Sequence, residues 1–495
     1  MRLILVGHEY RYAAEQILLT MFPGERPEYA GPEPGVSSAR ISLKRGGTYS
    51  SAVTVLRDGT GGRWTGSARV KNSALTDRLV TDRLLQKCVR ISFYRAAVCM
   101  TGRRPVWGAL TGIRPGRLVT NMLAQGQTEQ QAMRTMIREQ FVSPERAALC
   151  LDTSRASLHV SRSLNPEDIC LYIGIPFCPT RCAYCSFVSN SVERSLSLVE
   201  PFLETLTREI EHDAALVRHL GLRIVSVYFG GGTPTTLSAA QLDRLLGRLA
   251  DGFDLSSVEE YTVEAGRPDT ITPEKLEVLR RSGVTRVSVN PQTMRDDVLA
   301  AIGRRHTAHD VEKAVSMVRE AGIPSLNMDL IAGLPSDSAD GFRESLDRVM
   351  SFRPENITVH TLALKKGSRI TLEETPLPDE TAVGSMLDYA ASALSETGFR
   401  PYYLYRQKYM SGGFENVGWS LPGFESLYNI CIMEELCTIL SLGGGASTKL
   451  VNAAEGRIER VFNPKYPREY IDGLEKIRKK KEAVAAFYGR EPLVP

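Results

Sequence analysis

Residues 172–185 read YIGIPFCPTRCAYC, an apolar run that leads directly into three closely spaced cysteines. The apolar run begins at Ile169, and its length predicts a buried β-strand that ends near Ile175. Cys178, Cys182 and Cys185 follow at positions i, i+4 and i+7. The stretch therefore predicts a strand whose carboxyl end presents three thiols on a single loop.

Three thiolates on one loop can hold three irons of a [4Fe–4S] cluster, because cysteine thiolates are the usual ligands of such clusters. The fourth iron then has no protein ligand, and the amino and carboxylate groups of S-adenosylmethionine (SAM) suit that position. The alternatives are a zinc site or three unrelated thiols. Zinc normally takes four ligands, and the nearest histidine, His159, lies outside the strand. We therefore expect a [4Fe–4S] cluster and SAM as cofactors.

The alternation of short apolar strands and helical stretches continues to about residue 370. Repeated strand–helix units imply parallel strands with helices outside, which here predicts an α/β fold with a partial (β/α)6 barrel. In such folds ligands bind at the carboxyl ends of the strands. Helical patterns cover 198–220 and 239–249, and the predicted strands are Ile169–Ile175, Ile224–Phe229, Tyr261–Ala265, Arg286–Val289, Ser325–Ile331 and Ile357–Leu362.

Polar and glycine residues gather at the ends of these strands. The turn GGGTPT at 230–235 follows a strand, and glycines allow the backbone to approach a ligand closely. Glu264 lies in an otherwise apolar strand, where an unpaired carboxylate is costly. Gln292, Arg304 and Asp329 lie at strand or helix ends. Each alone fits a structural hydrogen-bond group, but together with the cysteines they favour a cofactor site.

The patterns divide the chain into three parts. We predict an N-terminal α+β extension of unknown role at residues 1–165. The core barrel is predicted at 166–370, and a C-terminal cap on the substrate side at 371–495. Strands are expected in the first part at 3–6, 40–43 and 52–56, with helices from Leu75 onward and at 129–139 and 144–161; in the last part a helix is expected at 380–396, a strand at 401–409 and a helical tail at 470–488. The turn TGIRPGR at 111–117 fits a surface turn better than an anion-binding one.

Composition narrows the class of protein. The 61 basic and 57 acidic side chains give a net charge of +4, so we expect no nucleic-acid partner. The amino terminus lacks a signal-peptide pattern, and no run of 18 apolar residues predicts a membrane span. The six cysteines outside the motif are scattered among apolar neighbours, which indicates reduced, buried thiols and a cytoplasmic location.

These residues resemble the oxygen-independent coproporphyrinogen III oxidase (dehydrogenase) family of radical SAM enzymes, which includes heme chaperones. The resemblance covers about 168–370. It implies that Cys178, Cys182 and Cys185 bind the cluster and, with Tyr172, form the catalytic set. It also implies a set of SAM contacts, which are Tyr172, Tyr184, Gly231, Gly232, Thr233, Glu264, Gln292, Arg304, Asp329 and Ala363.

The segments WGALTGIRPGR (107–117) and YYLYRQKYMSGGFENVGW (402–419) look like the coproporphyrinogen dehydrogenase branch common in Gram-positive bacteria. The resemblance implies that a 5′-deoxyadenosyl radical removes a β-hydrogen from a propionate of coproporphyrinogen III. Loss of carbon dioxide and one electron leaves a vinyl group, and two such reactions give protoporphyrinogen IX in porphyrin and heme biosynthesis. The partners implied are a low-potential electron donor and an electron acceptor.

Two positions depart from the oxidase pattern. Phe187 stands where oxidases carry a fourth cysteine, as in the heme chaperones, and Gly174 stands where they carry a histidine. The alternatives are therefore a heme chaperone, a radical enzyme that opens the heme ring, and a non-catalytic iron–sulfur scaffold. For a tetracarboxylate substrate the candidate cations are Lys365, Lys366, Arg406 and Lys408, and the candidate aromatic contacts are Tyr402, Tyr403 and Tyr405.

Overall fold

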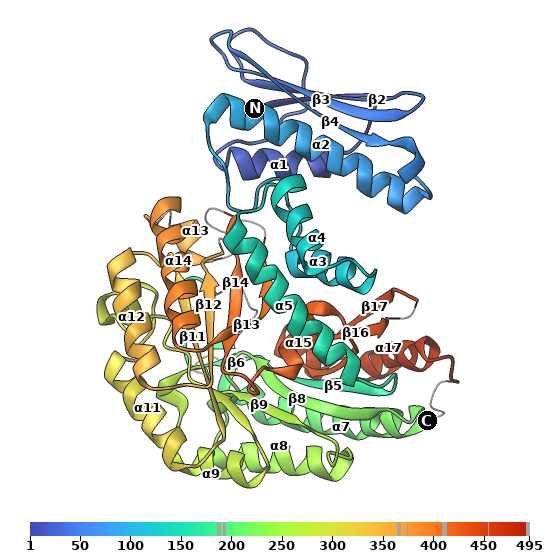
Figure 1. The fold of residues 1–495 in the computed structure, drawn as a ribbon. Coiled ribbons are helices and arrows are strands. Elements are labelled where there is room, and N and C mark those ends of the chain that lie inside the picture. Colours follow the sequence, from blue (N-terminus) through green and yellow to red (C-terminus); the bar gives the residue numbers. More distant parts are fainter. Residues whose placement is uncertain are drawn as a thin grey trace. The chain divides into compact units, whose positions relative to one another are not determined.

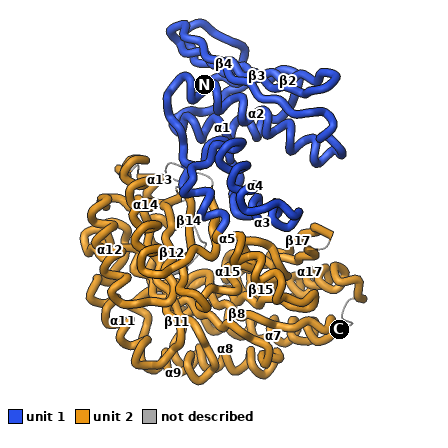
Figure 2. The backbone as a smooth tube through the Cα atoms, in the orientation of Figure 1, with its two compact units in different colours: residues 1–151, 412–414 blue, residues 152–411, 415–495 orange. Residues whose placement is uncertain are grey.

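The computed structural model describes residues 1–185, 190–191, 195–363, 368–373, 375–407, 413–453 and 455–491. Backbone contacts divide the chain into two compact units (Figure 2). The first comprises residues 1–151 with 412–414, and the second comprises 152–411 with 415–495. The three-part division at 165 and 370 stays a prediction about roles. None of the described helices is long and apolar enough to cross a bilayer.

The first unit is built on a four-stranded sheet in the order β1-β2-β3-β4 (Figure 1). β1 is parallel to β2, and the other pairs are antiparallel. Two helices, α1 and α2, supply apolar side chains to the core under one face of the sheet. The bounds are β1 Arg2–Val6, α1 Arg11–Met21, β2 Ser38–Arg45, β3 Tyr49–Arg57, β4 Arg63–Lys71, α2 Arg78–Thr101, α3 Pro115–Ala124, α4 Glu129–Arg134, a π-helix Thr135–Glu139 and α5 Pro144–Ser163, which continues into the second unit.

Strand β4 was not predicted from the sequence, although strands were expected near β1, β2 and β3. Its two buried positions, Gly66 and Ala68, are small, and Gly66 packs so close to α2 that a Cβ would lie 2.2 Å from the Ser92 carbonyl oxygen. Its outward positions are polar or basic. The apolar alternation that marks a strand is therefore weak in β4, and pairing with β3 determines its conformation.

The second unit contains six adjacent parallel strands, which confirms the predicted partial barrel core. They lie in the order β5-β8-β9-β10-β11-β12, and each pair of neighbours is parallel. Connecting helices lie along the outside of the curved sheet (Figure 1). The strands are β5 Asp168–Ile175, β8 Arg223–Gly231, β9 Glu260–Glu264, β10 Arg286–Ser288, β11 Ser325–Ala332 and β12 Asn356–Thr361, and the helices are α7 Val199–Leu220, α8 Ala239–Gly252, α9 Pro273–Arg281, α10 Asp296–Ala301, α11 Ala308–Glu320 and α12 Ala339–Ser351.

The C-terminal strands extend this sheet at both edges, a connection that the sequence patterns did not reveal. β13 and β14 follow β12 in antiparallel pairing, whereas β15 pairs in parallel with β5 and is followed by β16 and β17. Whether residues 371–495 also cap the substrate side remains a prediction. The elements are α13 Arg369–Leu372, α14 Glu380–Glu396, β13 Arg400–Tyr405, β14 Asn416–Ser420, α15 Leu427–Glu434, β15 Thr438–Gly443, β16 Ser447–Asn452, β17 Arg457–Phe462, α16 Pro467–Ile471 and α17 Leu474–Phe487.

A buried charge network ties the C-terminal helix α17 to α7. Lys481 is 1% exposed, and its Nζ contacts Asp213 and lies 3.6 Å from a carboxylate oxygen of Glu209. Burial opposes the charge, but the two carboxylates raise the pKa of Lys481 above its ordinary value. Glu209 also accepts hydrogen bonds from Asn463 and Tyr470. The network fixes the end of the chain against the core because removing one ion leaves its partners buried and uncompensated.

Candidate active site

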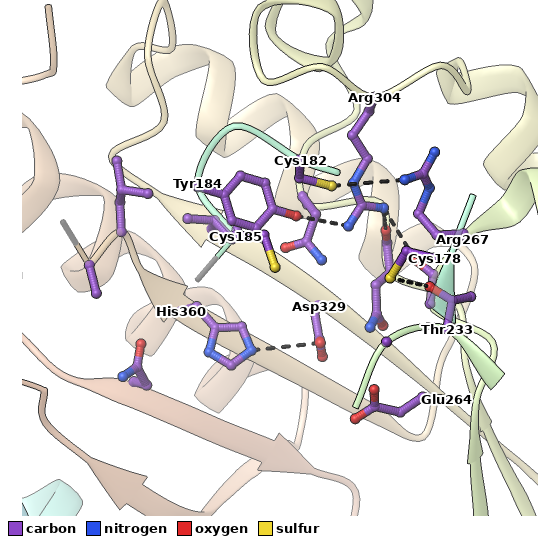
Figure 3. Close-up of a pocket in the computed structure, with 18 of the residues that line it drawn as sticks. Cys178, Cys182, Tyr184, Cys185, Thr233, Glu264, Arg267, Arg304, Asp329 and His360 are labelled. Atoms are coloured by element: carbon purple, nitrogen blue, oxygen red, sulfur yellow. Dashed lines mark hydrogen bonds and ion pairs between the residues drawn. The ribbon is translucent and has the colours of Figure 1, made fainter. Parts of the chain in front are cut away.

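The cysteine loop begins at the short strand β6 (Phe177–Cys178) and borders one cavity of about 370 Å³ (Figure 3). Cys178, Cys182 and Cys185 all line this cavity, as the sequence predicts. The loop is anchored from outside, since the Ala183 amide donates to the Ile302 carbonyl at 2.9 Å. Within the loop the Cys185 amide donates to the Cys182 carbonyl at 3.1 Å. The backbone therefore presents all three sulfurs to the same space.

Side chains from the neighbouring strand ends donate toward the sulfurs. The Thr233 hydroxyl lies 3.5 Å from the Cys178 sulfur, and a guanidinium nitrogen of Arg267 lies 3.9 Å from the Cys182 sulfur. The same arginine donates to the Thr180 hydroxyl at 2.9 Å. A donor or a positive charge beside a thiol stabilises the thiolate, which is the form that binds iron.

The glycine turn after β8 is locked against the strand that carries the cysteines. The Gly232 amide donates to the Ile175 carbonyl at 2.7 Å, and Gly231 adopts a φ of 101°, which favours glycine. A Cβ at Gly232 would lie 2.4 Å from the Phe177 carbonyl oxygen. Only a residue without a side chain allows this close approach, so the turn leaves backbone groups and open space beside the cysteines.

Glu264, at the end of β9, is a largely buried carboxylate in this cavity. The Tyr228 hydroxyl donates to it at 2.6 Å. Burial raises the pKa of Glu264 to about 7, and the nearby negative charge of Asp329 acts in the same direction. Near neutral pH this carboxyl is therefore poised between its neutral and charged forms.

Asp329, on β11, is the second carboxylate of the cavity and has the opposite tendency. Burial opposes its charge, but hydrogen bonding with His360 lowers its pKa below the ordinary value. The His360 Nε2 lies 3.6 Å from an Asp329 oxygen, and Asn327 donates to the other oxygen at 2.8 Å. Two carboxylates with pKa values shifted apart therefore share one cavity.

Arg304 is held in place by three acceptors. Its guanidinium donates to the Asn290 carbonyl at 2.8 Å, the Gly266 carbonyl at 3.2 Å and the Tyr184 hydroxyl at 2.9 Å. Two of these groups belong to strand ends, and Tyr184 belongs to the cysteine loop. The arginine thus connects the loop to the carboxyl ends of the sheet.

The cavity contains buried hydrogen-bond acceptors without partners, which indicate whether SAM could bind there. The Gln292 Oε1 and the Asn290 Oδ1 are buried and accept no hydrogen bond among the described residues. Gln292 also holds a strained backbone with φ of 70°, fixed by hydrogen bonds to Asp329 and Ile331. Buried acceptors require donors, and an amino acid with a ribose and an adenine supplies them. Together with three cysteines and a glycine cradle, these residues fit a cluster and SAM.

Almost all of the predicted site residues converge. Tyr172 is not among the cavity-lining residues; its ring stacks on Tyr228 and Tyr428, and its hydroxyl would lie 3.3 Å from a Cβ at Gly231. Of the predicted SAM contacts, those that line the cavity are Tyr184, Gly231, Gly232, Thr233, Glu264, Gln292, Arg304, Asp329 and Ala363. Their roles as cofactor ligands remain proposals.

Only some of the predicted substrate contacts line the cavity. Tyr405 lines the cavity, whereas Tyr402 and Tyr403 are buried and absent from its lining. Arg406 is also buried and does not line the cavity. Lys365, Lys366 and Lys408 lie outside the described residues, as does Phe187.

Several lining residues were not predicted. Arg267, Asn290 and His360 follow or end parallel strands, so the rule that ligands bind at carboxyl ends could have found them. Gln407 and Asn416 reach the cavity because β13 and β14 pair with each other and with β12. No local signal in the sequence marks that pairing.

Three of the scattered cysteines come together elsewhere. The sulfurs of Cys170, Cys431 and Cys437 all lie within 4.8 Å of one another in an apolar cluster. They are buried, as expected from the sequence, whereas Cys99 is exposed, so the expectation that all six scattered cysteines are buried is wrong at that position. None of them lines the cavity, and the Cys170 and Cys437 sulfurs lie 3.7 Å apart.

Comparison with known proteins agrees with this geometry. The model of the radical SAM superfamily matches residues 172–349. The chain is 39% identical over 380 residues to the oxygen-independent coproporphyrinogen-III oxidase-like protein HemZ of Bacillus subtilis, an alignment that covers 76% of each chain. It is 30% identical over 280 residues to the heme chaperone HemW of Lactococcus lactis, covering 56% of this chain and 68% of that one.

Among solved structures, coproporphyrinogen III oxidase (HemN) of Escherichia coli matches with a TM-score of 0.52 and 23% identity, over 67% of this chain and 72% of that one. At this identity the match supports the fold alone. Radical SAM proteins use a [4Fe–4S] cluster and SAM, which are therefore the cofactors of this protein. The chain belongs to the radical SAM superfamily, in the family of the oxygen-independent coproporphyrinogen-III oxidase-like proteins.

Proposed function

We propose that this protein catalyses the oxygen-independent oxidative decarboxylation of coproporphyrinogen III to protoporphyrinogen IX. The observation that carries the proposal is the single cavity that joins the three cysteines, the polar strand ends and the β12–β14 side chains. Identity of 39% to HemZ over three quarters of both chains supports the same reaction class. The product would enter porphyrin and heme biosynthesis.

When bound, the reduced cluster and SAM supply a 5′-deoxyadenosyl radical that can remove hydrogen from an unactivated carbon. Cys178, Cys182 and Cys185 would hold the cluster. Gly232 gives backbone access to the amino acid part of SAM, and Gln292 offers an unpaired acceptor. The protein's contribution is to orient the reacting groups and to exclude water from them.

Residues from β12–β14 supply the remaining wall and are candidates for substrate contact. Tyr405 offers an aromatic face, while Gln407 and Asn416 offer amide groups for propionate carboxylates. His360 is held at Asp329 and can donate toward an anion through its other nitrogen. Lys365, Lys366 and Lys408 are proposed as the cations that a tetracarboxylate requires.

A heme chaperone is the second candidate. The 30% identity to HemW of Lactococcus lactis, over 68% of that protein, favours it. A chaperone would bind heme tightly and would not decarboxylate coproporphyrinogen III. Radical opening of the heme ring is a further alternative, which predicts a linear tetrapyrrole as product.

The test is anaerobic turnover of the reconstituted protein with coproporphyrinogen III, SAM, a low-potential reductant and an electron acceptor. Mass spectrometry should show loss of two carboxyl groups, with methionine and 5′-deoxyadenosine formed in step. Cys178→Ala should abolish both products, whereas the matched change Cys99→Ala, at an exposed cysteine of α2, should leave them intact. Tight heme binding without decarboxylated porphyrinogen would reject the oxidase in favour of the chaperone.

A further inference from the structure

Basic and acidic side chains are distributed unequally between the two units, although the net charge of the whole chain is small. Residues 1–151 carry 22 basic and 11 acidic side chains, a net charge of +11. Residues 152–495 carry 39 basic and 46 acidic side chains, a net charge of −7. Such asymmetry between the parts of a chain is typical of a unit with an anionic partner.

The positive charge is concentrated on one face of the sheet in the first unit. The pairing register places alternate residues of β2, β3 and β4 on the face opposite the core. Val53 and Val55 on that face are flanked by serine and threonine, and no aspartate or glutamate occurs in β2, β3 or β4. Six exposed cations occupy the face, namely Arg40, Lys44, Arg57, Arg63, Arg69 and Lys71.

The arrangement of these cations is costly without a counterion. Arg57 and Arg63 stand directly opposite each other on β3 and β4, and like charges in that position destabilise a sheet. None of the six cations takes part in an ion pair among the described residues, although Arg69 lies over the Tyr49 ring at 4.7 Å. The face, which will be called the basic face, is therefore prepared for an anion supplied from outside.

A cavity continues the basic face around the edge strand β4. Its volume is about 560 Å³, and it lies between β4, α2 and the π-helix Thr135–Glu139. Arg69 and Lys71 belong to both the face and the cavity, and Lys87, Arg95 and Arg138 add further cations. The single acidic lining residue, Glu139, already pairs with Lys87 at 2.8 Å. The positive surface thus extends from the sheet face into a cavity at its edge.

The expectation of no nucleic-acid partner rested on the net charge of the whole chain, which hides the basic face. We propose that the basic face and its edge cavity bind nucleic acid through the phosphate backbone. Spaced Lys and Arg side chains with neighbouring hydroxyls match the groups that contact phosphates, and the row of cations on adjacent strands suits a repeating anion. A membrane surface fits less well, because Val53 is the one large apolar side chain of the face that is prominently exposed, at 37%. Few aromatic rings lie on the face, so the contacts should carry little sequence preference.

The test measures binding of fluorescein-labelled single-stranded RNA and duplex DNA to the full chain by fluorescence anisotropy, between about 50 and 200 mM salt. Wild-type protein should bind at least one of the two, with affinity that falls steeply with salt. The triple change Arg57→Gln, Arg63→Gln and Arg69→Gln should weaken binding at least tenfold. It should also make the logarithmic salt dependence shallower by about 2 for the single strand and about 3 for the duplex, as expected for three lost phosphate contacts.

The matched control neutralises three exposed arginines of the same unit that lie off the face, by Arg26→Gln, Arg78→Gln and Arg134→Gln. Binding within about threefold of wild type supports the assignment, while equal loss in both triple variants overturns it in favour of diffuse charge attraction. A triple Arg→Lys variant of the basic face should retain binding, which guards against a folding defect. Absence of RNA and DNA binding by wild type, or binding only to phosphatidylglycerol vesicles, also overturns the proposal. SAM cleavage should be unchanged in all variants.

Discussion

Replacing Glu264 by glutamine should stabilise the SAM-free protein at alkaline pH. The folded state raises the pKa of Glu264 from about 4.5 to about 7, chiefly by burial. Between these two values the folded protein holds a proton that the unfolded chain releases, so the free energy of unfolding falls as the pH rises. Glutamine keeps the neutral shape, can still accept from the Tyr228 hydroxyl, and removes this titration.

The size of the effect follows from the shift. A rise of about 2.5 pKa units corresponds to at most about 3 kcal/mol of stability, which is fully lost above pH 7. Below pH 4.5 the glutamine variant should therefore match wild type, and at pH 8 it should be more stable by up to that amount. For a unit of this size the gain corresponds to a Tm higher by about 4 °C.

The assay is thermal unfolding of the SAM-free full chain at pH 5 and at pH 8. Asp329→Asn is the matched control in the same cavity, because the pKa of Asp329 is lowered by hydrogen bonding with His360. Its charged form is the stabilised one, so Asn should lower the Tm at both pH values. Glu264→Gln should also weaken SAM binding if the carboxylate contacts the cofactor. An identical pH dependence of Tm in wild type and Glu264→Gln would refute the reasoning.

Two further predictions concern stability and the glycine turn. Lys481→Ala should destabilise the protein by about 3–5 kcal/mol in urea unfolding, because Asp213 is left buried and uncompensated; the change Lys479→Ala, at an exposed position of the same helix, should cost less than about 1 kcal/mol. Gly232→Ala should abolish SAM binding in equilibrium dialysis, because its Cβ would lie 2.4 Å from a backbone oxygen. The control Gly247→Ala, at a position of α8 with open space around it, should leave SAM binding unchanged. Preserved SAM binding in Gly232→Ala would contradict the assigned close approach.

Local sequence patterns were sufficient to predict the cofactors and the six parallel strands of the core. Cys178, Cys182 and Cys185 lie on one loop, so their spacing can be read directly from the sequence. A buried strand such as Ile224–Phe229 can be recognised from its own apolar residues. The carboxyl-end rule then places the polar residues that follow each strand in one region. For these reasons Glu264 and Asp329 could be assigned to the cavity without coordinates.

Only the tertiary structure revealed the features formed by segments that are far apart in the sequence. β15 joins β5 across more than 250 residues, and β14 brings Asn416 to the cavity, because strand pairing is satisfied by any complementary edge and leaves little local signal. The basic face is likewise invisible in a net charge of +4. Pairing register alone aligns Arg57 with Arg63 and turns charges that are dispersed in the sequence into one surface.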